Sequence, residues 1–517
     1  MRFQAGKRAF VRVLARLTST EPVGSREFFW LCLPALLIGL FLRLHFLWVT
    51  PQGYFGADSG SYFEFSHELF TKGQFELTPK RRWLYPIVLA LLTPLPAPCW
   101  YLVPLIQHAL GLATVVGIGW ITLRLSTTPR LTIPLVTLIS AIWPRMLWYE
   151  HEFIAETFLL AAFVCTVSLA LIPGVLRSKR GLFFFFLSLI FLAGFKAAGR
   201  FLWLGVVIAV LITAGDPRRW AWSVKSALAA ITCLAVAATV GKSSQGYWLL
   251  LNSVLPLIQE SGEPHSRYRE ALRPLILEAR SLGDHYPWQK YKYKKMLNKS
   301  DSRAIHPEWP ALLKNKQRFS KVARDLSAKA IRTNPDKFLQ FTLSTVAITL
   351  ANDGVNHRFE PSHFWREQSA NTNNKWLTNP SYLTLAFRVD KPQFVQLADQ
   401  GRRKTYPLQH FHRWVDDLLR PLGMQPGRKG LESFSLRPFG LLIVLGFLRS
   451  LRPRLNRRAA LLLLPTGVYL FAVFAVGDAV GRYLHPVEWV AFVLAVLAIE
   501  ALVRLLLHGI RALSRSL

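Results

Sequence analysis

Long apolar runs separated by short basic segments dominate the chain. Residues 102–123, 131–149, 153–172 and 484–507 form such runs, and each approaches or reaches the roughly 20 residues that cross a bilayer as a helix. The first run, 28–48, is long enough to remain as an anchor, so we expect no cleavable signal peptide before it. The pattern therefore predicts an all-α polytopic membrane protein.

Basic segments between the runs predict their orientation. Short segments rich in Lys and Arg stay on the cytoplasmic side of a membrane. One threading places six of them there: 7–16, 124–130, 177–180, 218–225, 449–458 and 511–515. The spans would then cover 28–48, 101–123, 131–149, 153–172, 182–198, 201–214, 222–241, 438–449, 459–476 and 484–507. Hydropathy thus predicts a bundle of roughly 10–13 transmembrane helices, with the runs 84–95 and 338–350 at the membrane interface.

This threading divides the chain into four parts. Residues 1–27 form a basic cytoplasmic N-terminus, and residues 28–245 form a transmembrane module whose first outer loop covers 49–100. Residues 246–437 are polar, basic and rich in Trp, Tyr and Pro, and they are predicted to form a mostly helical extracytoplasmic region. Residues 438–517 add C-terminal transmembrane helices and a basic cytoplasmic tail.

The net charge narrows the classes of partner. The 517 residues carry a formal charge of +33, although 51% of them are hydrophobic. Such a charge is typical of proteins that bind nucleic acid or anionic lipid. Because the large polar region is predicted on the outer side, we expect membrane lipids or an anionic glycan as partners, and no nucleic acid. The four cysteines lie in or beside apolar runs without CxxC spacing, as packing residues do.

Ionisable residues gather at the predicted outer ends of the spans. A charged group within a span costs roughly 2.5–3.5 kcal/mol, so it usually marks a site. Glu156 follows Glu152 by four residues, which predicts that both lie on one helix face. The residues concerned are Asp58, Glu150, His151, Glu152, Glu156, Lys196, Arg200, Asp478, Arg482 and His485, whereas Glu64 and Arg81 are interpreted as ordinary loop residues. Carboxylates and cations together indicate a buried polar pocket that acts on a phosphate-bearing substrate.

Six short motifs follow one another in a characteristic order. They are Ala57-Asp58-Ser59-Gly60-Ser61-Tyr62, Arg82-Trp83-Leu84-Tyr85-Pro86, the helix that starts with Gln107–Leu112, Phe153–Thr157, Gly194–Arg200 and Arg482-Tyr483-x-x-Pro486. In order and sidedness the chain resembles the GT-C glycosyltransferases, particularly the bacterial branch similar to protein mannosyltransferases and to the transferases that add aminoarabinose to lipid A. The resemblance covers residues 28–214 and, more weakly, 459–500.

The resemblance implies an inverting glycosyltransferase that moves a sugar from a polyprenyl-phosphate donor to a glycan, lipid or protein acceptor on the outer face of the inner (cytoplasmic) membrane. Asp58 would take the proton of the acceptor hydroxyl as general base. Lysine and arginine would stabilise the lipid phosphate that leaves. Glu152 or Glu156 would orient sugar hydroxyls or a phosphate-binding arginine. The candidate substrate-binding residues are Tyr62, Arg82, Tyr85, Glu152, Glu156, Lys196, Arg200, Arg482 and Tyr483.

The sequence departs from the family pattern at one position, which bears on whether the enzyme needs a metal. Two other functions also remain as alternatives. Many relatives carry an acidic pair in the first loop, but Ser59 follows Asp58 here, which favours an enzyme without metal or other cofactor. One alternative is a polymerase or ligase of lipid-linked glycans that uses outer histidines such as His265, His285 and His306. The other is a transporter or flippase of an anionic lipid, although the internal repeats typical of transporters are not evident.

Overall fold

The structure is a computed structural model of the whole chain. It describes residues 16–49, 51, 53, 59–73, 82–95, 99–213, 254–260, 262–263, 265–283, 312, 316–351, 393, 396, 425–426, 432–433, 440–451, 453–476 and 484–516. The predicted span 222–241 and the basic segment 218–225 lie outside the described residues, as do Asp58, Asp478, Arg482 and Tyr483.

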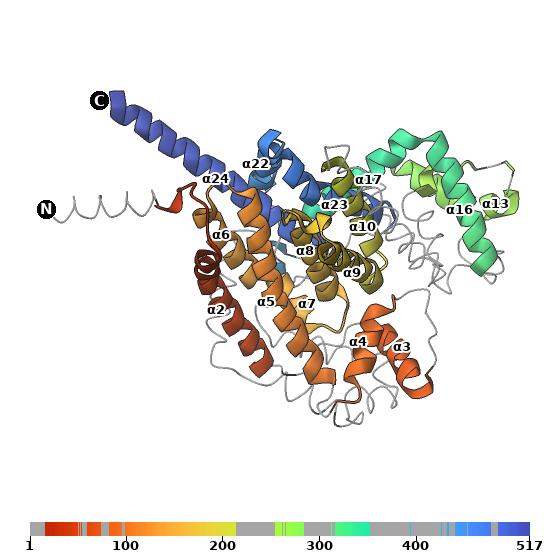
Figure 1. Ribbon diagram of the computed structural model, residues 1–517. Helices are drawn as coiled ribbons and strands as arrows, with labels where there is room; N and C mark the ends of the chain where they lie inside the picture. Colours follow the sequence, from red (N-terminus) through yellow and green to blue (C-terminus); the bar gives the residue numbers. More distant parts are fainter. Residues whose placement is uncertain are drawn as a thin grey trace.

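Apolar helices form a bundle that accounts for most of the described chain (Figure 1). Its helices are α2 (Ser25–Val49), α5 (Cys99–Leu125), α6 (Pro129–Ile142), α7 (Pro144–His151), α8 (Glu156–Leu171), α9 (Lys179–Phe195), α10 (Gly199–Thr213), α22 (Gly440–Ser450), α23 (Pro453–Val476) and α24 (His485–Ser516). The short helices α3 (Ser59–Lys72) and α4 (Leu84–Leu92) pack on each other beside it. The one strand pair described joins Gln425–Pro426 to Glu432–Ser433.

Four described helical stretches are long and apolar enough to cross a membrane: Ser25–Trp48, Tyr101–Leu125, Arg458–Ala475 and His485–Ile510. The helices α6 and α7 pass the same test only as a pair, which is bent by 49°, so the count rises to five if the pair is one span. The prediction of an all-α membrane protein with several spans is confirmed. The helix α4, which falls on the run 84–95, has only nine residues and is not among the spanning candidates.

The bend between α6 and α7 differs from the single span predicted over 131–149. Trp143 precedes Pro144, and its φ of −63° and ψ of 120° are those of an extended residue. A proline ring disfavours helical geometry in the residue before it, and proline is well suited to the first turn of a new helix. The chain therefore stops one helix at Trp143 and starts another in a new direction at Pro144.

A second, smaller core lies within the region predicted to be extracytoplasmic. The helix α13 (Ser266–Ser281) packs beside the short η3 (Leu255–Leu257), and α16 (Lys316–Thr333) leads through Asn334 into α17 (Pro335–Ala351). In Figure 1, α13 and α16 stand on the side of the molecule away from α2. The helix α17 contacts α23 of the bundle, with the rings of Phe338 and Phe471 6.3 Å apart.

Basic segments from distant parts of the chain meet at one end of the bundle. Glu500 on α24 accepts hydrogen bonds of 2.8 Å from the backbone N–H groups of Thr127 and Thr128, just before α6 begins. A carboxylate in that position complements the helix dipole and caps the first turn. Arg449 on α22 pairs with Glu500 at 2.8 Å, and Arg458 on α23 donates to the carbonyl oxygen of Arg124 at 3.0 Å. The segments 124–130 and 449–458 thus share one end, as the threading predicts.

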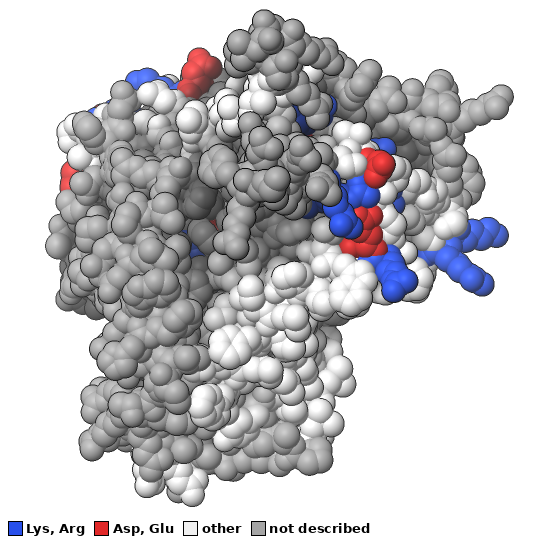
Figure 2. Space-filling view, turned by 90° about the vertical axis from the view of Figure 1, so that its left-hand side faces the viewer, with Lys and Arg blue, Asp and Glu red and all other residues white. Residues whose placement is uncertain are grey.

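Charged side chains are unevenly spread over the described part of the surface. On the face seen in Figure 2, Lys, Arg, Asp and Glu side chains gather in the upper and middle parts, and the described surface in the lower part carries other residues. Many large apolar side chains of the bundle point outward, among them Trp30, Phe41 and Trp48 of α2 and Leu505 of α24. Such an apolar outer surface is what a lipid-facing bundle requires.

Adding a single methyl group at Gly205 is expected to destabilise the bundle. The helices α10 and α23 cross at Gly205, where a Cβ atom would come within 2.3 Å of the Cα of Pro465. Because the obstacle is backbone, Gly205→Ala should lower the free energy of unfolding by about 1–3 kcal/mol, as overpacking does. Gly467→Ala is the matched control, since a Cβ there meets nothing within 4 Å. Thermal unfolding of the purified variants tests this, and equal midpoints would contradict it.

Candidate functional site

Glu156 and Lys196 form a buried ion pair at the end of the bundle opposite Glu500. Glu156 starts α8 and Lys196 directly follows α9, so the antiparallel packing of these helices brings the two residues together. The Lys196 ammonium donates a hydrogen bond to Glu156 Oε1, and the side chains are only 13% and 2% exposed. The structure thus brings these two predicted site residues together.

Two arginines lie near each other at this same end. Arg82 precedes α4 and is buried, while Arg200 lies in the first turn of α10 and donates from Nε to the carbonyl oxygen of Ala197 at 3.1 Å. Burial lowers the pKa of the Arg82 guanidinium, and the positive charge of Arg200 lowers this pKa further. Trp83, next to Arg82, lies beside Gly194 near the end of α9, where a Cβ atom would come within 3.4 Å of its ring, so Arg82 and Arg200 belong to the same end of the bundle.

His485 connects the start of α24 to the same region. Its ring lies 4.6 Å from the ring of Tyr149, and both Arg145 and Lys196 act on it electrostatically. Arg145 of α7 in turn pairs with Glu488 of α24 at 3.0 Å, with both side chains about 2% exposed. The turns that hold Lys196 and His485 therefore share one face, as the threading predicts.

Tyr62 and Tyr85 pack against each other where α3 meets α4. Their rings are 5.0 Å apart in an edge-on arrangement, and both side chains are buried. The hydroxyl of Tyr85 donates to Gln107 Oε1 at 3.2 Å, which ties α4 to α5. Tyr85 is fully buried and acts here as a link between helices, while a direct contact of either tyrosine with substrate stays a prediction.

The position of Glu152 differs from the sequence prediction. Glu152 does not share a helix face with Glu156, because α7 ends at His151 and α8 begins only at Glu156. Its backbone is extended, with a φ of −92° and a ψ of 143°, and its carbonyl oxygen accepts a 2.7 Å hydrogen bond from Gln107 Nε2. The i, i+4 rule holds only within one continuous helix, which this segment is not.

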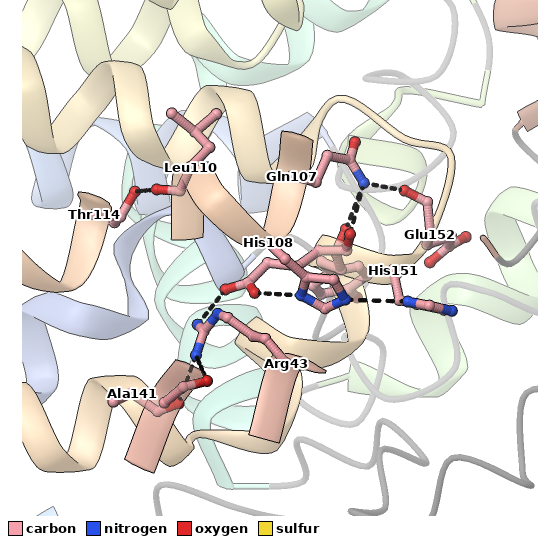
Figure 3. Close-up of polar contacts among 11 residues, drawn as sticks. Arg43, Gln107, His108, Leu110, Thr114, Ala141, His151 and Glu152 are labelled. Carbon is pink, nitrogen blue, oxygen red and sulfur yellow. Dashed lines mark hydrogen bonds and ion pairs between the residues drawn. The ribbon is translucent and has the colours of Figure 1, made fainter. Parts of the chain in front are cut away.

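A buried network that sequence reasoning missed crosses α2, α5 and α7 (Figure 3). Arg43 donates to Glu150 Oε1 at 2.6 Å, and the other carboxylate oxygen lies 2.9 Å from His108 Nδ1. His108 Nε2 is 3.1 Å from His151 Nδ1. Arg43 also donates to the carbonyl oxygens of Gly39 and Ala141, at 3.0 and 3.1 Å.

This network fixes the turn that carries Glu150 and His151. Gln107 on α5 donates to the carbonyl oxygens of Glu150 and Glu152, at 3.0 and 2.7 Å, so α5 holds the turn at two points. Figure 3 shows Gln107 beside Glu152. The signal for it was present in the sequence, since Arg43 and His108 are ionisable residues within apolar runs. Which partner each one meets follows only from the rotation of the helices.

The first outer loop, residues 49–100, is described at 49, 51, 53, 59–73, 82–95 and 99–100. Gly53 lies against the turn after α7, where a Cβ atom would meet the Phe153 ring at 2.7 Å and the His151 carbonyl oxygen at 3.1 Å. Ser59 is fully buried at the start of α3. Asp58 itself lies outside the described residues, so its role stays a prediction.

The described residues add no support to the histidine-based alternative or to a metal site. His265 contacts Asp325 at 3.2 Å beside the start of α13, and His285 and His306 lie outside the described residues. Among the described residues, no group of three or more His, Cys, Asp or Glu side chains is arranged to hold a metal ion.

Comparison with known proteins gives matches among solved structures. The archaeal oligosaccharyltransferase AglB from Archaeoglobus fulgidus, in complex with an inhibitory peptide and a dolichol-phosphate, matches 95% of this chain with 13% identity and a TM-score of 0.40. Its apo form gives a TM-score of 0.42 at 12% identity over 94% of this chain. In both cases the match spans 52% of the archaeal protein, so the chain covers about half of its length.

A bacterial protein also matches. ArnT from Cupriavidus metallidurans bound to undecaprenyl phosphate matches 91% of this chain and 77% of its own length, with 17% identity and a TM-score of 0.33. ArnT and the archaeal enzyme are GT-C glycosyltransferases, the class that the sequence motifs resemble. No family model matches the chain, and neither does any curated protein sequence.

Proposed function

We propose that the chain is a GT-C-type inverting glycosyltransferase that transfers a sugar from a polyprenyl phosphate to an acceptor at the Glu156 end of the bundle. The observation that carries this proposal is the buried pair of Lys196 and Glu156, with Arg82 and Arg200 at the same end of the bundle. Clustered, fixed positive charge next to an apolar bundle suits a phosphate attached to a long hydrocarbon chain.

The proposed reaction is a displacement at the anomeric carbon of the donor. The acceptor hydroxyl oxygen forms a bond to that carbon while the bond from the carbon to the phosphate oxygen breaks. Asp58 takes the hydroxyl proton, and the electron pair of the broken bond leaves with the polyprenyl phosphate. The leaving group is already a stable anion, so fixed cations suffice to stabilise it and no acid is needed.

Four described residues have a part in this proposed reaction. Lys196 and Arg200 bind the phosphate oxygens, and Arg82 adds to the positive potential around them. Glu156 keeps the Lys196 ammonium in place through their hydrogen bond, so the cation is oriented before the donor binds. Because Ser59 replaces the second acid of the first loop, we propose that transfer proceeds without a bound metal.

We propose the same sidedness as in the sequence threading. The Glu156 end then faces the periplasm or cell exterior, and the end that holds Glu500 faces the cytoplasm. The region 246–437 would lie on the outer side beside the site, where its basic residues favour an anionic acceptor.

Replacement of Arg200 by alanine tests the role of the cation cluster. In membranes supplied with a polyprenyl-phosphate sugar, Arg200→Ala should slow transfer by about 10²–10³-fold, because a fixed charge that stabilises the departing phosphate is lost. Arg332→Ala, at an exposed position of α16, is the matched control and should transfer normally. Normal transfer by Arg200→Ala at equal protein level would contradict the proposal.

Mass spectrometry of envelope glycans and lipids separates the proposed function from its alternatives. Comparison of cells with and without the protein should show the loss of one sugar from a defined acceptor. Loss of long polymers would instead indicate a glycan polymerase or ligase. An unchanged set of covalent structures with an altered distribution of one lipid would indicate a transporter.

A further inference from the structure

A cavity of about 640 Å³ opens at the Glu500 end of the bundle, far from the proposed transfer site. Segment 20–28, the end of α5, the turn into α6 and parts of α23 and α24 enclose it. Its lining includes the basic residues Arg124, Arg458 and Arg504 and the apolar residues Val23, Phe28 and Leu123. The cavity therefore offers both positive charge and apolar surface.

The three arginines are held close together by contacts that leave their charge uncompensated. Arg458 donates to the carbonyl oxygen of Arg124 at 3.0 Å, and Arg504 donates to Thr127 Oγ1 at 2.7 Å. The Arg124 guanidinium lies 4.3 Å from the centre of the Trp120 ring, which orients it without neutralising it. Among the described residues, no ion pair joins any of these three arginines to a carboxylate.

The acids nearby are already engaged by other groups. Glu21, which also lines the cavity, lies 3.5 Å from Arg130. Glu500 is held by Arg449 and by the backbone N–H groups of Thr127 and Thr128. The described part of the cavity thus has a surplus of positive charge that an anion from outside the chain would balance.

We propose that this cavity binds the phosphodiester headgroup of an anionic phospholipid. Arginines hold phosphate oxygens well, and basic pockets between transmembrane helices are suited to anionic headgroups. The apolar wall of Val23, Phe28 and Leu123 gives the glycerol and upper acyl chains a surface to cover, which a free phosphate ion would not use. Trp120 marks the depth of the membrane interface, where phospholipid phosphates lie. The site is distinct from the proposed transfer site and does not depend on it.

Native mass spectrometry of the full-length protein in a neutral detergent tests the assignment. The probes are phosphatidylglycerol and phosphatidylcholine with identical acyl chains. Phosphatidylglycerol should bind about a hundredfold more tightly, because each of the three arginines contributes roughly a factor of five, and Arg458→Gln/Arg504→Gln should lower the preference to about fivefold. Both side chains are exposed, so the variant should fold normally. Arg324→Gln/Arg332→Gln removes equal charge from exposed positions of α16 and should keep the preference.

Three results would overturn the proposal. Wild-type protein that binds both lipids equally has no site for the anionic headgroup. A double variant that keeps the preference places the site elsewhere. Displacement of phosphatidylglycerol by excess inorganic phosphate would mean that the cavity takes a free phosphate and not a lipid. If the double variant melts below the wild type without lipid, Arg504→Gln alone is measured in its place, and it should lower the preference by about fivefold.

Discussion

Asp58→Asn should lower sugar transfer by about 10²–10⁴-fold, because asparagine cannot accept the proton of the acceptor hydroxyl. Asp58 stands in the sequence between two described residues, Gly53 and Ser59. Gly53 lies against the turn after α7, and Ser59 is buried at the start of α3. The helix α3 packs on α4, directly after Arg82. Gly53 and Ser59, the described residues on either side of this stretch, thus belong to the end of the bundle that holds Arg82 and Glu156.

Glu64→Gln is the control for this prediction. Glu64 lies one turn further along α3, is partly exposed, and has no assigned role in the reaction. Initial rates of transfer from a radiolabelled polyprenyl-phosphate sugar in membranes would measure both variants at matched protein level. Donor binding should survive in Asp58→Asn, since the phosphate-binding cations remain. Near-normal transfer by Asp58→Asn would show that another group takes the proton.

Arg43→Met should lower the free energy of unfolding by about 3–5 kcal/mol, the cost of removing one partner of a buried ion pair. Arg43 and Glu150 are 1% and 3% exposed at the side chain, and their nitrogen and oxygen are 2.6 Å apart. Without Arg43, the Glu150 carboxylate keeps its contact with His108 but loses the positive charge of the guanidinium group beside it. The carbonyl oxygens of Gly39 and Ala141 lose their arginine donor as well.

A second substitution separates the destabilising effect of the unpaired buried charge from that of lost packing. In Arg43→Met/Glu150→Gln no charge is left behind, so the double variant should unfold at a higher temperature than Arg43→Met. Arg273→Met breaks an exposed pair with Glu260 at 3.3 Å and should cost less than about 1 kcal/mol. Unfolding of the purified protein in detergent, followed by tryptophan fluorescence, measures all three. Equal effects of Arg43→Met and Arg273→Met would contradict the prediction.

The sequence by itself determined the helical membrane architecture and much of the end where cations gather. Apolar runs of spanning length have no other stable form in a bilayer than helices, because each backbone polar group must be paired within the segment. Consecutive short-linked helices are antiparallel, so the pairing of ends follows from the threading alone. That is why Glu156, at the start of α8, and Lys196, after α9, were expected together and are found together.

Only the tertiary structure decided which side chains meet inside the bundle. The rotation of each helix about its axis and the close approach of neighbouring helices determine those contacts, and a hydropathy pattern contains no information on either. At Gly111, for example, a Cβ atom would lie 2.0 Å from Glu150 Oε1, so the Glu150 carboxylate fits beside α5 only because this residue is glycine. The contact of Arg43 with Glu150 spans 107 residues, and the extended Trp143 before Pro144 redirects the helix that carries Glu150. Local sequence determines the helices, whereas packing between distant helices determines which of their polar groups meet.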